Sequence, residues 1–172
     1  QWDLLEAIDG WPGGPAEPAR DAVEMPLDAR VDAEIARRLH AAQVTPAHTL
    51  IVAHVSAGNP FRRWPEPAFS SLLVSLVRAD PDRRIIISSG PSDRAAADRI
   101  AAAARAKLGP LAAGIVEFGE FGLAELRALI GRSRLFIGGD TGPLHIAATT
   151  ATPVVGLYGP TLPERSAPWR DP

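Results

Sequence analysis

Residues 50–55, Leu50-Ile51-Val52-Ala53-His54-Val55, form a short apolar run rich in β-branched side chains, which predicts a buried strand. The same texture returns at residues 84–89, 114–118, 135–137 and 153–158. Helical periodicity separates these runs, over residues 68–79, 92–108, 123–131 and 144–150. Strands that alternate with helices of this length pair in parallel through right-handed crossovers. Because the runs are apolar throughout, helices are expected on both sheet faces, and the sequence predicts an α/β fold with a doubly wound, Rossmann-like parallel sheet.

The first 45 residues have a different character. Residues 10–30 are rich in Pro, Gly and Ala, which predicts an irregular segment. Residues 29–43 suit a helix that Asp28 could cap. We therefore expect a linker and a leading helix over residues 1–45, the remnant of an inter-domain region, and the Rossmann-like domain over residues 46–172.

Composition removes several classes of function. The formal net charge of −2 argues against a nucleic-acid partner bound through bulk positive charge. The absence of cysteine excludes disulfides, thiolate catalysis and cysteine-ligated zinc, and the 4 histidines show no metal-ligand spacing. No apolar run reaches the roughly 18 residues of a spanning helix, and the first residues do not resemble a signal peptide. A soluble, cytoplasmic domain is expected.

The segment after the fourth predicted strand carries the strongest functional signal: Gly138-Gly139-Asp140-Thr141-Gly142-Pro143-Leu144-His145. Pro143 suits the first position of a helix, which makes Thr141 or Gly142 the cap. Free N–H groups and the helix dipole would then form an anion site. Asp140 would repel phosphate and is better placed to accept hydrogen bonds from sugar hydroxyls. The alternative is an ordinary capped strand-to-helix turn. His145 falls in the first turn of the helix, where it either donates a hydrogen bond to the ligand or is packed and neutral.

Two further loops follow the first and second predicted strands. Ser56 to Pro65 contains Arg62 and Arg63, and guanidinium groups in a Gly/Pro loop suit a diphosphate. The alternative is a pair of solvated arginines, with the following tryptophan packed on the next helix. Asp93 could accept ribose hydroxyls, or could complement the dipole of a helix capped by Ser92.

These loops together resemble glycosyltransferase family 9, whose best-known members are the ADP-heptose:lipopolysaccharide heptosyltransferases. The resemblance rests on residues 140–148 and 153–161, and on Arg62-Arg63-Trp64-Pro65, which is similar to the family's Lys-x-Trp-Pro loop. It covers about residues 50–168.

The resemblance implies the C-terminal half of a GT-B glycosyltransferase, which holds a nucleotide-diphospho-sugar, typically ADP-heptose, and needs no metal or other cofactor. The general base and the acceptor surface, for a glycan or glycolipid, would belong to an N-terminal domain that the first 50 residues are too short to contain. We therefore expect an inactive fragment, truncated at its C-terminus, of an enzyme at the inner face of the membrane. The alternatives are a non-catalytic nucleotide-sugar-binding module and a GT-B-like epimerase or hydrolase that uses Asp140 and His145.

The resemblance also assigns roles to the loop residues. Arg62 falls where the family has a phosphate-binding lysine and would stabilise the leaving diphosphate. Asp93 falls where the family often has a ribose-binding glutamate, and Asp140 would contact the donor sugar. The full set of expected substrate-binding residues is Ser56, Asn59, Arg62, Arg63, Asp93, Asp140, Thr141, Gly142 and His145.

Overall fold

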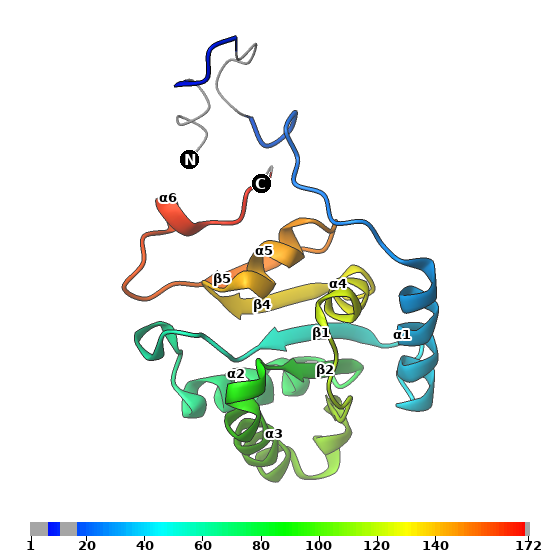
Figure 1. Ribbon diagram of the computed structural model, residues 1–172. Coiled ribbons are helices and arrows are strands. Elements are labelled where there is room, and N and C mark those ends of the chain that lie inside the picture. The colour runs from blue at the N-terminus through cyan, green and yellow to red at the C-terminus, as the bar shows by residue number, and fades with distance from the viewer. Residues whose placement is uncertain (1–6, 11–16, 171–172) are drawn as a thin grey trace.

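A computed structural model describes residues 7–10 and 17–170, and its centre is a five-stranded, all-parallel sheet in the order β3-β2-β1-β4-β5 (Figure 1). The strands are β1 (Thr49–His54), β2 (Arg83–Ser88), β3 (Ile115–Val116), β4 (Leu135–Gly139) and β5 (Val154–Leu157). The expected doubly wound parallel sheet is therefore confirmed, with most strand ends within two residues of the prediction.

The third strand is shorter than predicted. Residues 114–118 were expected to be extended, but only Ile115 and Val116 pair with β2. A 3-10 segment, η4 (Gly109–Gly114), leads into β3. Gly114 lies close to the helix at residues 66–79, and a Cβ on Gly114 would be 2.6 Å from Cγ1 of Val77. Beyond β3 the chain leaves the sheet, and Gly119 adopts a φ of 72°, a left-handed conformation that suits glycine.

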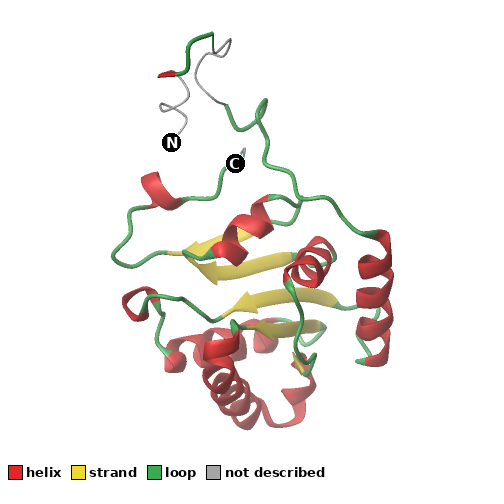
Figure 2. Ribbon diagram, viewed as in Figure 1, coloured by secondary structure: helices red, strands yellow, loops and turns green. Residues whose placement is uncertain are grey.

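Helices cover both faces of the sheet (Figure 2). They are α1 (Ala29–Ala41), α2 (Glu66–Ala79), α3 (Arg94–Leu108), α4 (Leu123–Gly131), α5 (Gly142–Ala148) and α6 (Pro163–Ser166), with 3-10 turns η2 (Pro60–Arg62) and η3 (Pro91–Asp93). The short helix α6 has no counterpart in the sequence prediction. None of the helices within the described ranges is long and apolar enough to cross a membrane.

Two hydrophobic cores lie on the two faces of the sheet. Successive side chains of a strand point to opposite faces, so Ile51 and Ala53 of β1 pack with α2 and α3, whereas Leu50 and Val52 pack with α1, α4 and α5. Fully buried Phe, Leu and Ile side chains dominate both cores, and each contributes roughly 1.5–3 kcal/mol by leaving water.

Helix α1 begins as the sequence predicts. Oδ1 of Asp28 accepts a hydrogen bond from the Arg30 N–H at 2.8 Å and so satisfies one of the free donors of the first turn. Ile35 and Leu39 are buried in the core shared with α4. Part of the expected linker, residues 1–6 and 11–16, lies outside the described residues, and the domain boundary at residue 45 stays a prediction.

The strand order fixes where a ligand site belongs. From β1 the chain winds outward through β2 to β3, and it then returns to the other side of β1 to form β4 and β5. The order therefore reverses between β1 and β4, which pair from Ile51↔Leu135 to His54↔Gly138. In open α/β sheets, ligands bind in the crevice outside the carboxyl ends of the strands at this switch point.

Candidate functional site

The switch-point crevice brings the two main predicted segments together. Arg62, which ends η2 after β1, places its Nη1 3.1 Å from Oδ2 of Asp140, the residue that follows β4. The backbones of the two loops also meet, since a Cβ on Gly139 would lie 3.7 Å from the carbonyl oxygen of Arg62. The arginine loop and the turn after β4 therefore face the same crevice, as their positions in the sequence predict.

Asp140 is unusually placed for a carboxylate. Its side chain is only 7% exposed, and although Arg62 lies at ion-pair distance, no group of the described residues donates a hydrogen bond to Oδ2. A buried acceptor without a donor is costly, so this oxygen suits a ligand hydroxyl. Tyr158 lies close enough that its pKa is raised, first by burial and then by the negative charge of Asp140.

Helix α5 opens toward the same crevice. It begins at Gly142, so Pro143 is its second residue rather than its first, and Thr141 is the N-cap. The Thr141 hydroxyl donates to the Gly139 carbonyl at 3.3 Å and does not cap the helix. Nothing lies within 4 Å of the position that a Gly142 side chain would take, so the space before this turn is open. His145 is exposed, and the alternative of a packed histidine does not hold.

Arg63 makes a second ion pair, one strand further along the sheet edge. Its Nη2 lies 2.9 Å from Oδ1 of buried Asp93, and its Nε donates to the Ala57 carbonyl at 2.9 Å. Asp93 itself occupies the N-cap position of α3 without a capping bond, so the expectation that Ser92 caps this helix is wrong. The carboxylate turns to Arg63 instead, and neither arginine of the loop is a merely solvated side chain.

Ser56 and Asn59 hold the loop in shape. Oγ of buried Ser56 accepts from the Gly90 N–H at 2.7 Å, which ties the loop after β1 to the turn after β2. Oδ1 of Asn59 accepts from the Phe61 N–H at 3.0 Å and caps η2. Trp64 packs edge-on against Phe69 of α2, with ring centroids 5.0 Å apart, so the tryptophan packs on the next helix as the alternative interpretation expected. Contact of Ser56 or Asn59 with a substrate stays a prediction.

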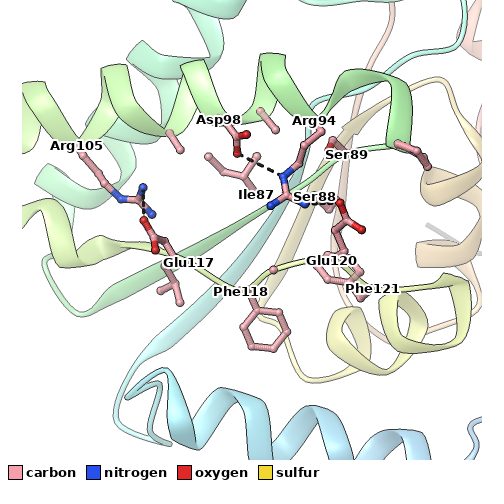
Figure 3. Close-up of a pocket in the computed structure, with 16 residues that line it drawn as sticks. Ile87, Ser88, Ser89, Arg94, Asp98, Arg105, Glu117, Phe118, Glu120 and Phe121 are labelled. Atoms are coloured by element: carbon pink, nitrogen blue, oxygen red, sulfur yellow. Dashed lines mark hydrogen bonds and ion pairs between the residues drawn. The ribbon is translucent and has the colours of Figure 1, made fainter.

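A cavity of about 550 Å³ lies along the same sheet edge, at the ends of β2 and β3 (Figure 3). Its walls are the turn after β2, one face of α3 and the segment after β3. Two ion pairs join these walls: Arg105–Glu117 at 3.0 Å and Arg94–Glu120.

The sequence located this cavity only in part. The loop at residues 118–123 follows the third predicted strand, a position that favours contact with a ligand, and residues 118–121 line the cavity. The contribution of α3 was missed. Its lining residues are spaced by three and four positions, the signature of one helix face: Arg94, Ala97, Asp98, Ala101 and Arg105.

His54, at the end of β1, is a core histidine with a hydrogen-bonding partner. It is buried, and its Nδ1 lies 2.8 Å from Oγ of Ser88. Burial is the larger influence on this imidazole and lowers its pKa to about 4, against the smaller opposing effect of the Asp93 charge. The ring is therefore neutral in the folded protein at neutral pH.

His54 predicts a pH-dependent stability. Its folded pKa of about 4 lies below the unfolded value of about 6.5, so between these values the unfolded chain binds the proton that the folded chain does not. The free energy of unfolding should fall as the pH is lowered through this window, by about 2 kcal/mol from pH 7 to pH 5. Urea unfolding of the wild type and of His54→Gln across this range measures the effect. Parallel pH profiles for the two proteins would contradict it.

The fold and the crevice define an α/β protein whose crevice lies at the switch point of a parallel sheet, where ligands bind in open sheets of this class. The sequence profile of glycosyltransferase family 9 (heptosyltransferase) matches residues 17–172, and the chain belongs to this family. It is 34% identical over 123 residues to lipopolysaccharide heptosyltransferase 3 of Escherichia coli K12. That match covers 70% of this chain and 34% of the relative, so the chain spans about a third of the relative's length.

Solved structures share the fold. The E. coli ADP-heptose lps heptosyltransferase II is similar with a TM-score of 0.71 at 21% identity, over 88% of this chain and 46% of that one. The E. coli heptosyltransferase WaaC, solved with ADP-2-deoxy-2-fluoro heptose, is similar with a TM-score of 0.57 at 25% identity, over 71% of this chain and 38% of that one.

Proposed function

We propose that this chain is the donor-binding part of a glycosyltransferase, and that it holds a nucleotide-diphospho-sugar, ADP-heptose or a close analogue, at the β1/β4 crevice. One observation carries the proposal. At the switch point, Arg62 lies beside the open start of α5 and beside a buried Asp140 oxygen that lacks a hydrogen-bond donor. A cation and free backbone N–H groups suit a diphosphate, and an unsatisfied carboxylate oxygen suits a sugar hydroxyl.

The ligand would lie along the carboxyl edge of the sheet. The diphosphate takes Arg62 and the turn at Thr141 and Gly142, and the sugar hydroxyls take Asp140. The cavity at the ends of β2 and β3 takes the nucleobase, because it adjoins the crevice through the Ser56–Gly90 hydrogen bond. The ribose then falls between these positions, near Asp93, whose carboxylate it shares with Arg63.

The proposed reaction is displacement at the anomeric carbon by an acceptor hydroxyl. Negative charge builds on the leaving diphosphate, and Arg62 with the N–H groups at the start of α5 stabilises it. This electrostatic role is why we propose a metal-independent reaction. The general base and the binding surface for a glycan or glycolipid acceptor are assigned to another part of the whole enzyme, acting at the cytoplasmic face of the membrane. Without that part, the chain binds donor and turns over nothing.

A thermal-unfolding panel tests the proposal. The 172-residue chain is heated with ADP, UDP, GDP, AMP or no ligand, each nucleotide at the same millimolar concentration. A ligand that binds only the folded state raises the midpoint, and at a fixed concentration the shift grows with the logarithm of the affinity. We expect ADP to give the largest shift, and AMP a smaller one because it lacks the second phosphate. A larger shift with UDP would change the proposed donor, and no shift with any nucleotide would contradict nucleotide binding.

A further inference from the structure

Arg38 lies outside the cavity and contacts the loop of residues 118–121, which forms one of the cavity walls. Its Nη2 donates to the carbonyl oxygens of Phe118 and, at 3.1 Å, of Glu120. Its Nη1 donates to Oε1 of Glu125 at 3.0 Å, and its guanidinium carbon lies 4.6 Å from the centroid of the Phe118 ring. One side chain of α1 thus makes four contacts with residues 118–125, about 80 positions away in the sequence.

The side of this loop that faces away from Arg38 lines the cavity. Phe118, Gly119, Glu120 and Phe121 all line the cavity, whereas Arg38 does not. Figure 3 shows the Phe118 ring on the side of the loop toward the pale blue helix α1. The packing is close enough that a Cβ on Gly119 would lie 3.7 Å from Nη2 of Arg38. Arg38 therefore contacts the cavity wall from the side opposite to the cavity.

Phe118 and Phe121 also pack against the core on the α1 face of the sheet, but the ion pair of this loop on its cavity side is weaker. On the cavity side the loop is joined to α3 by Arg94–Glu120, whose side chains are 48% and 80% exposed, and exposed ion pairs contribute little. The Arg38 side chain, by contrast, is 21% exposed. It also positions Glu125, whose Oε2 accepts from the Gly122 N–H at 2.7 Å where α4 begins. Removing Arg38 would leave the Phe118 carbonyl without its partner and Glu125 without its counter-ion.

We propose that Arg38 is a positioning residue, which fixes residues 118–121 as a wall of the cavity and thereby sets the affinity for the nucleobase part of the ligand. The consequence for affinity rests on the proposed function. The diphosphate contacts lie elsewhere, at Arg62 and at the start of α5, so Arg38 should act on the base and leave the phosphates alone.

Arg37 provides a matched control. It is the neighbouring residue on α1, it is exposed, and it pairs with Glu34 one turn away on the same helix. Arg37→Met and Arg38→Met lose the same charge and gain the same side chain, but only the second releases the loop. Arg38→Lys keeps the charge and loses the planar fork that reaches two carbonyl oxygens and a carboxylate at once.

Two measurements on the 172-residue chain test the proposal. Amide hydrogen exchange at Gly122, whose N–H donates to the Glu125 carboxylate that Arg38 holds, should speed up about tenfold or more in Arg38→Met, less in Arg38→Lys and not at all in Arg37→Met. Calorimetry should show ADP binding weakened about tenfold in Arg38→Met, with inorganic pyrophosphate binding unchanged. Thermal unfolding of each variant confirms that it is folded.

The outcomes separate the two proposals. Unchanged exchange at Gly122 overturns the positioning role, and equal loss of ADP and pyrophosphate affinity overturns its selectivity for the base. If the wild type binds no ADP, the proposed function fails, and the exchange comparison alone decides whether Arg38 holds the loop.

Discussion

Arg62→Met is expected to weaken ADP binding about a hundredfold. A guanidinium makes charge-assisted hydrogen bonds to phosphate oxygens, and the loss of two such bonds costs roughly 3 kcal/mol. The loss also leaves Asp140, whose counter-ion is Arg62, facing the diphosphate with its charge uncompensated. Isothermal titration calorimetry with ADP measures the change.

Two variants sharpen this test. Arg62→Lys keeps the positive charge but can offer only a point contact, so we expect most of the affinity to remain, within about tenfold. Arg37→Met removes one positive charge from an exposed site on α1 and should bind ADP as the wild type does. ADP binding by Arg62→Met within twofold of the wild type would show that the phosphates bind elsewhere.

Asp140→Asn is expected to change ADP and ADP-heptose binding in opposite directions. The substitution removes a negative charge beside the proposed diphosphate position and frees Arg62, so ADP should bind several-fold more tightly. It also weakens the acceptor for the sugar hydroxyls, so ADP-heptose should lose its advantage over ADP. The ratio of the two affinities should fall about a hundredfold, the equivalent of one to two charge-assisted hydrogen bonds.

The measurement is a pair of calorimetric titrations on wild type and Asp140→Asn. Because both ligands share the nucleotide, general damage to the fold would weaken both alike. That parallel loss, or an unchanged ratio, would remove Asp140 from the sugar site.

The two arginine–carboxylate pairs have a common consequence for ligand binding. Without ligand, Arg62 and Arg63 each face a buried carboxylate, so the loop carries little net charge toward the crevice. Arg63 is further tied to the Ala57 carbonyl, which suits it to hold the loop. Arg62 has the ion pair with Asp140, and it is therefore the arginine that can turn toward a phosphate at the smaller cost.

The fold follows from local patterns in the sequence. Apolar runs such as residues 50–55 and glycines and prolines at their ends mark the strands, and the switch point follows once the strands are known to be parallel. The patterns were less informative at the third strand, where only Ile115 and Val116 pair with β2. The chain then leaves the sheet, and the apolar character of residues 114–118 does not reveal this.

The loops that form the candidate site could be predicted from the sequence, but most of the side-chain pairings between them could not. The meeting of Arg62 with Asp140 follows from strand order, because Asp140 directly follows β4 and Arg62 lies in the loop after the adjacent strand β1. Two other interactions join segments that are far apart in the chain. They are the ion pair of Arg63 with Asp93 and the contacts of Arg38 with residues 118–125. Periodicity and spacing report only local structure. Side-chain partners that are far apart in the sequence can therefore be identified only from the three-dimensional structure.

The proposed function requires that a nucleoside diphosphate binds across the ends of β4, β1 and β2. Titration of the isotope-labelled chain with ADP, followed through backbone amide chemical shifts, tests it most directly. We predict saturable changes at residues 58–63, 117–122 and 139–145, which are far apart in sequence and together at this edge of the sheet. Changes confined to the opposite edge, where residues 45–49 and 132–135 lie, or no change at millimolar ADP, would contradict the claim.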